Sequence, residues 1–228
     1  MRKMLLVVIL LGLVASGLPM TAMALGLDVE AKVGAGVALG TTDNASVTGT
    51  ARMAADGGVG IDLYLISLGS IDIGVSTGVE YSYLTFHSTW SNFPFAGVDQ
   101  TTDSKYNYIN VPIALIGSMP VGSSLTLVVR AGGFIGYFLS GTADNTYSNP
   151  IVPSNTATLD SSNTIQWEYG LHLSAGTDIG LGGNLAVSPA IQFDMGLTDT
   201  SVNGGAAGNF KDTFWSLTLA VGIKYKVL

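Results

Sequence analysis

Apolar and polar residues alternate through most of this chain, and the apolar positions carry odd numbers in every alternating run. This pattern predicts β-strands with one apolar face, because successive side chains of a strand point to opposite sides. Eight runs of this kind follow one another, which leaves little room for helices after the first segment. The runs cover residues 27–39, 53–65, 71–85, 106–117, 125–139, 165–179, 185–197 and 213–227.

The charged residues test this assignment of faces. Those in or beside the runs are all even-numbered, so the odd-numbered face is predicted to be free of charge along its whole length. The residues concerned are Asp28, Glu30, Lys32, Arg52, Asp56, Asp62, Asp72, Glu80, Arg130, Glu168, Asp178, Asp194, Lys224 and Lys226.

The connections between runs alternate in length. Antiparallel neighbours joined by tight turns at one end and long polar loops at the other form an up-and-down meander, and eight such strands can close into a barrel without free edges. The predicted short connections are 66–70, 119–124 and 180–184, and the long ones are 40–50, 86–104, 140–163 and 198–212.

Alternation alone allows the apolar face to point into a soluble ligand-binding barrel or outward into lipid. The even-numbered face is dominated by Gly, Ser and Ala, and only 11% of the chain is charged, against about 25% in a typical soluble domain. Small residues suit the narrow interior of an eight-stranded barrel. We therefore expect the apolar face to point outward and the polar face to line the lumen.

Aromatic residues support a membrane setting. Strands that cross a bilayer need about 9 to 11 residues, and they carry Tyr and Trp where the hydrocarbon meets the headgroups. Backbone groups in lipid need internal partners, which only a closed barrel provides for strands. The predicted interface aromatics are Tyr81, Tyr83, Tyr137, Trp167, Tyr169 and Trp215 near the long loops, and Tyr225 near the opposite end.

The first 24 residues differ from the rest. Arg2 and Lys3 precede an apolar run over 4–14, which is followed by a Gly/Pro break and an Ala-Met-Ala sequence at 22–24. The apolar run is too short for a membrane-spanning helix, which needs about 20 residues. This layout predicts a secretory signal peptide over 1–24 and a barrel over 25–228.

The layout resembles the small outer-membrane β-barrel family of Gram-negative-type bacteria, the eight-stranded OmpA/OmpX-like barrels. The segments Tyr-Asn-Tyr-Ile-Asn-Val-Pro at 106–112 and Trp-Glu-Tyr-Gly-Leu at 167–171 are similar to strand motifs of that family. The resemblance implies an outer-membrane location, with outer-membrane lipid and the assembly machinery as partners. One departure is Leu228, because the family commonly ends in a Phe that the assembly machinery reads.

The even-numbered charges predict two layers inside the barrel. Opposite charges in a narrow lumen should pair, since an unpaired buried charge costs several kcal/mol. We predict a lower plug, in which Glu30 and Asp178 lie slightly below the other members. Above it we predict an acidic layer with no cation except possibly His172, and this layer is either hydrated or holds a cation. The plug comprises Glu30, Lys32, Asp62, Arg130, Asp178 and Lys224, and the acidic layer comprises Glu80, Glu168, His172 and Asp194.

Function is less constrained by the sequence. The favoured hypothesis is a structural or surface-interaction barrel whose four long loops contact an extracellular ligand, although the loops are equally consistent with solvated caps. The alternatives are a small pore and a barrel-embedded lipid-modifying enzyme, for which His172 and Ser174 share the lumen face. No Cys, cofactor or metal motif is present, and a net charge of −7 argues against nucleic-acid binding. We expect no enzymatic activity.

Overall fold

Every helix or strand element in the described part of the chain is a β-strand. The computed structural model describes residues 26–42, 45–92, 97–160, 164–198 and 212–227, so the predicted signal peptide and Leu228 lie outside the described residues. The strands are β1 (Gly26–Thr42), β2 (Val47–Thr50), β3 (Arg52–Leu68), β4 (Ile71–Trp90), β5 (Gln100–Pro120), β6 (Leu125–Tyr147), β7 (Asn155–Leu159), β8 (Trp167–Gly182), β9 (Leu185–Gly196) and β10 (Asp212–Lys226).

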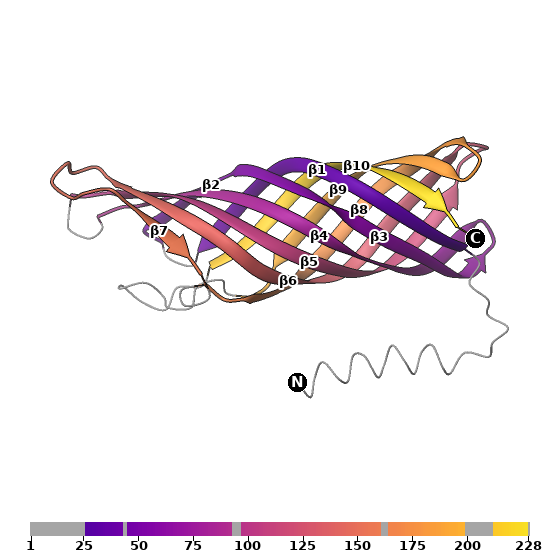
Figure 1. Ribbon diagram of the computed structural model, residues 1–228, viewed down its shortest axis with the longest axis horizontal. Helices are drawn as coiled ribbons and strands as arrows, with labels where there is room; N and C mark the ends of the chain where they lie inside the picture. Colours follow the sequence, from indigo (N-terminus) through magenta and orange to yellow (C-terminus); the bar gives the residue numbers. More distant parts are fainter. Residues whose placement is uncertain (1–25, 43–44, 93–96, 161–163, 199–211, 228) are drawn as a thin grey trace, which may run out of the picture.

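The eight long strands form a closed antiparallel barrel (Figure 1). Each pairs with its neighbours in the order β1, β3, β4, β5, β6, β8, β9 and β10, and β10 pairs back with β1 from Asp28↔Lys226 to Thr42↔Asp212. This confirms the predicted all-β, eight-stranded up-and-down barrel. Among the described residues, no helix is long and apolar enough to cross a membrane.

The two ends of the barrel differ. At the turn end, strands are joined through the short connections 69–70, 121–124 and 183–184, and Gly26 and Lys226 also lie there. At the loop end, strands extend well beyond the predicted runs: β4 continues to Trp90, β5 begins at Gln100 and β6 continues to Tyr147. The prediction that residues 86–104 and 140–163 form long loops is therefore wrong over much of their length.

These extensions form what we call the loop-end sheet: β2, 87–90, 100–106, 141–147 and β7, hydrogen-bonded side by side. They are rich in Thr and aromatic residues, which favour strands. They lack the apolar alternation of the barrel runs, so hydropathy alone predicts loops there.

The predicted outward direction of odd-numbered residues is observed. Val33, Leu115 and Leu219 are about two-thirds exposed, whereas Ala114 and Ala220 are buried in the interior. A register shift between Tyr64 and Ile66 reverses the parity at the end of β3, so that the even-numbered Ile66 and Leu68 also face outward.

The interior is narrow enough for glycine to be required at close strand contacts. A Cβ added at Gly36 on β1 would lie 2.0 Å from the Leu217 carbonyl oxygen on β10. Small inward residues therefore allow the tight curvature that eight strands need to close.

Candidate functional site

Charged side chains from five strands meet inside the barrel near the turn end. Arg130 Nη2 on β6 lies 2.8 Å from Glu30 Oε2 on β1 and 2.7 Å from Asp62 Oδ2 on β3. Lys224 Nζ on β10 lies 3.0 Å from the same Asp62 oxygen and 2.8 Å from Asp178 Oδ2 on β8. We call these five residues the lower network, and the structure brings together all but one of the residues expected in the plug.

Hydroxyl groups complete the lower network. Ser76 donates a hydrogen bond of 2.6 Å to Asp62 Oδ1, and Ser188 donates one of 2.7 Å to Asp178 Oδ1. Lys224 has no exposed surface, so its ammonium depends entirely on these carboxylates for stabilisation.

Lys32 is the predicted plug residue that lies elsewhere. Its Nζ lies 2.8 Å from Glu80 Oε1 and donates a 2.7 Å hydrogen bond to Gln192 Oε1. The prediction that Glu80 belongs to a layer without a cation is therefore wrong. Lys32 on β1 and Glu80 on β4 both pair with Gly58 on β3, so the strand register itself brings these two side chains together.

Gln192 extends this second set of contacts. Its Nε2 donates to Glu80 Oε2 at 3.2 Å and to Asp194 Oδ2 at 2.8 Å, while His172 Nδ1 lies 2.6 Å from Asp194 Oδ1. We call Lys32, Glu80, His172, Gln192 and Asp194 the middle network. The charge pattern of the sequence does not reveal Gln192, although its even number marks it as inward.

Two carboxylates next to the middle network belong to neither network. Asp56, which the sequence assigned to no layer, and Glu168 make no ion pair with a described residue. Both line a cavity of about 20 Å³, together with Asp194 of the middle network. In the described part of the chain, no three His, Asp or Glu side chains converge closely enough to hold a metal ion by themselves.

Aromatic side chains fill the lumen toward the loop end. The Phe86 and Phe214 rings stack with centroids 4.1 Å apart, Tyr106 lies 5.0 Å from Phe214, and Tyr108 packs edge-on against Phe138 at 5.5 Å. We call these five residues the aromatic cluster. The expectation of a lumen dominated by small residues is wrong at this level. The five aromatic residues have even numbers, and this parity is the sequence signal that marks them as inward.

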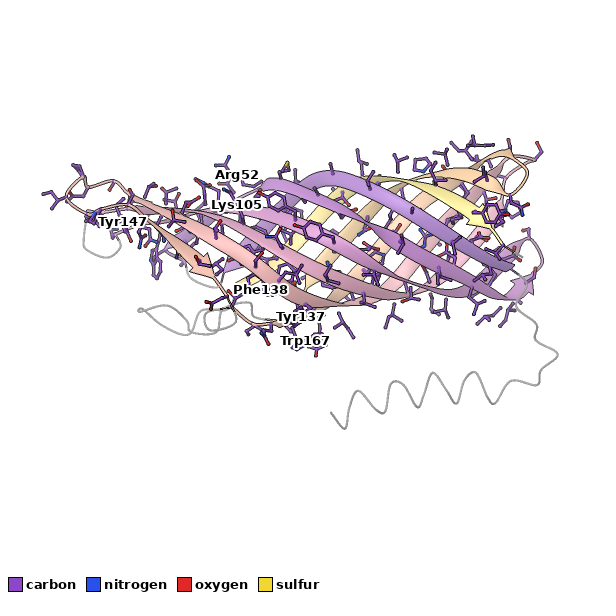
Figure 2. All side chains as sticks on the ribbon, in the orientation of Figure 1. Arg52, Lys105, Tyr137, Phe138, Tyr147 and Trp167 are labelled. Atoms are coloured by element: carbon purple, nitrogen blue, oxygen red, sulfur yellow. The ribbon has the colours of Figure 1, made fainter. Side chains whose placement is uncertain are left out.

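The predicted interface aromatics lie on the odd-numbered outer face. Tyr137 and Trp167 on neighbouring strands pack with ring centroids 4.9 Å apart and project from the barrel wall (Figure 2). Tyr81 hydrogen-bonds Asn107. Tyr81, Tyr137, Trp167, Tyr169 and Tyr225 are exposed, and Tyr83 and Trp215 are partly exposed.

Ion pairs also form on the loop-end sheet. His87 Nδ1 lies 2.8 Å from Asp103 Oδ1 and 3.0 Å from Arg52 Nη2, and Lys105 Nζ lies 3.8 Å from Asp144 Oδ2. The loop charges Asp43, Asp199 and Lys211 lie outside the described residues.

Comparison with known proteins identifies a matching protein family. A family model described as outer membrane protein beta-barrel domain matches residues 21–202. No curated protein matches the chain significantly.

One solved structure shows the same fold, and two others are similar over most of their length. The outer membrane protein OprG from Pseudomonas aeruginosa has a TM-score of 0.50 and 12% identity, covering 91% of this chain and 99% of that one. A major outer membrane protein from Thermus thermophilus has a TM-score of 0.45 and 13% identity, covering 88% and 99%. The outer membrane protease OmpT from Escherichia coli has a TM-score of 0.43 and 10% identity, covering 87% and 96%.

Proposed function

Because the chain belongs to the outer membrane protein β-barrel family, we propose that it is a non-conducting barrel of the outer membrane that presents its loop-end sheet to the outside of the cell. In this proposal the turn end faces the periplasm and the barrel acts as a rigid support. Contacts with an extracellular ligand then fall to the loop-end sheet and its connections, since binding residues commonly lie on segments that a rigid scaffold displays.

The observation that carries the non-conducting role is the filling of the lumen at three successive levels. The lower and middle networks join strands across the interior through charged contacts of 2.6–3.2 Å, and the aromatic cluster packs beyond them. Two cavities that the described residues line between these levels are each about 20 Å³, roughly the room for a single water molecule. Ion flow needs a continuous water path, which side chains at three levels interrupt.

Planar-bilayer recording tests whether the lumen is closed to ions. Wild-type protein is expected to show no steady current above that of the bare membrane. Arg130→Ala is expected to stay silent too, because it opens only the lower network and leaves the middle network and the aromatic cluster in place. Steady conductance in the wild type would favour the pore instead, and conductance in Arg130→Ala alone would show that the lower network is the sole barrier.

Deletion of residues 143–158 removes the tip of β6 and most of β7. It tests whether the loop-end sheet contacts an extracellular ligand. The barrel strands remain paired without this segment, so the variant is expected to reach the outer membrane and to keep a gel mobility that changes on boiling. Cells producing it are expected to lose at least half of the adhesion that wild-type cells show on a panel of immobilised polysaccharides and matrix proteins. Unchanged adhesion, or none in the wild type, would contradict a contact role for this hairpin.

A further inference from the structure

A small cavity between the middle network and the aromatic cluster is lined by carboxylate, amide and hydroxyl groups. We call it the upper cavity; its volume is about 20 Å³. Asn110 Oδ1 belongs to a residue that lines it and is buried without a partner in the described structure, whereas the Thr218 hydroxyl hydrogen-bonds the Asp56 carboxylate. Buried polar atoms normally find partners, and leaving one without costs about 1–3 kcal/mol.

Glu168 adds a second, independent sign of a missing positive group. Its side chain is 5% exposed, it lines the upper cavity, and it forms no ion pair with a described residue. Thr218, at 2% exposed, is buried still more deeply. A buried carboxylate normally pairs with a cation or is protonated.

The charges of the lumen point the same way. Three cations in the described lumen, Lys32, Arg130 and Lys224, are all committed to the lower and middle networks. Asp194 is held by His172 and Gln192, so Asp56 and Glu168 are the carboxylates of the cavity that remain without a cation.

The carboxylates reach the cavity because the facing residues are glycines. A Cβ at Gly196 would lie 2.1 Å from Glu168 Oε1, and a Cβ at Gly34 would lie 2.6 Å from Asp56 Oδ1. A Cβ at Gly136 would lie 2.6 Å from Asn110 Oδ1 and 3.7 Å from Glu168 Oε2, so these two oxygens lie over the same glycine. Each of these oxygens is therefore packed closely against a neighbouring strand.

We propose that the upper cavity binds one dehydrated monovalent cation, of the size of sodium, potassium or ammonium. The donor set of carboxylate, amide and hydroxyl oxygens suits hard cations. Magnesium usually keeps several of its waters, and the cavity has room for about one water-sized species. A single water could donate only two hydrogen bonds and would leave both carboxylates uncompensated.

The test is thermal unfolding of the purified full-length barrel in detergent at pH 8, in the chlorides of sodium, potassium, ammonium and N-methylglucamine at equal ionic strength. N-methylglucamine is too large for the cavity. We expect at least one of the small cations to raise the unfolding midpoint saturably above its value in N-methylglucamine. Glu168→Gln should remove the difference between the salts, and it should be the more stable protein in N-methylglucamine because one uncompensated charge is gone.

Asp28→Asn provides the matched control. Asp28 is also a buried lumen carboxylate without an ion pair to a described residue, but it lies at the turn end, outside the upper cavity. This variant should keep the full cation dependence. Equilibrium dialysis with radioactive sodium and rubidium, the latter standing for potassium, should give one bound ion per wild-type or Asp28→Asn chain for a stabilising ion and none for Glu168→Gln.

Two results would overturn the proposal. Equal unfolding midpoints in all four salts would mean that a water or a proton satisfies the cavity. A cation effect that persists in Glu168→Gln, or that disappears in Asp28→Asn, would place any binding elsewhere on the barrel.

Discussion

Lys224→Met is expected to destabilise the barrel by about 3–5 kcal/mol, the loss that follows when one partner of a buried ion pair is removed. The ammonium is fully buried and lies 2.8 Å from Asp178 and 3.0 Å from Asp62. Arg130 still pairs with Asp62 in the variant, so the uncompensated charge is that of Asp178. Unfolding in urea or guanidinium, followed on protein refolded into lipid vesicles, measures the change.

Lys226→Met is the matched control, because it removes the same charge two residues further along β10 from an exposed position. Its effect should stay within about 0.5 kcal/mol. Adding Asp178→Asn to Lys224→Met should recover most of the loss, since it removes the charge left without a partner. Equal losses at Lys224 and Lys226, or no recovery in the double variant, would show that the ion pair is not what stabilises this level of the lumen.

Phe214→Ala should cost about 3–5 kcal/mol, as large-to-small substitutions of buried aromatic residues do. Its ring stacks on Phe86 at 4.1 Å and lies 5.0 Å from Tyr106, so the truncation leaves a cavity in the aromatic cluster. The same vesicle unfolding measurement applies. Phe214→Leu should lose less than half as much, because most of the volume is retained.

Phe193→Ala controls for the loss of an aromatic ring in general. Phe193 lies on β9 on the outer face and packs beside Trp215 at 6.3 Å. Lipid can fill the space that its ring leaves, so the loss should be clearly smaller than for Phe214. A larger loss at Phe193 than at Phe214 would mean that the outer face, rather than the aromatic cluster, stabilises the loop end.

The barrel itself could be predicted from sequence because its surroundings impose a simple rule. Lipid on one side and a narrow lumen on the other require strict alternation, and Val33, Leu219 and Ala220 all obey it. The same rule places Arg130 and Lys224 in the lumen, together with the carboxylates that pair with them. The bulge at Tyr64/Ile66 breaks the parity of β3, and nothing in the hydropathy pattern marks a bulge.

The loop-end strands, the contacts of Lys32 and the aromatic cluster depend on information that hydropathy alternation does not contain. Beyond the apolar runs, strands such as β7 need no apolar face, so composition could not separate them from loops. Lys32 pairs with Glu80 because both lie opposite Gly58 in the strand register, and hydropathy alternation does not give the register. The aromatic cluster was missed because inward positions were expected to be small, whereas Phe86 and Phe214 fill the interior with stacked rings.

The pairing of β1 with β10, which closes the barrel and which we call the seam, affects how the chain folds. It joins Asp28 to Lys226, almost the whole length of the described chain apart, so this pairing carries the largest loop-closure entropy of any in the barrel. Until it forms, β1 and β10 have open edges that can pair with other chains. Lys224 lies on the last strand, so closing the seam and bringing its ammonium between Asp62 and Asp178 belong to the same late step. A barrel in which β1 and β10 have not paired therefore has both open strand edges and an unpaired Lys224. Pairing of these two strands removes both features at once, so closure of the barrel is cooperative.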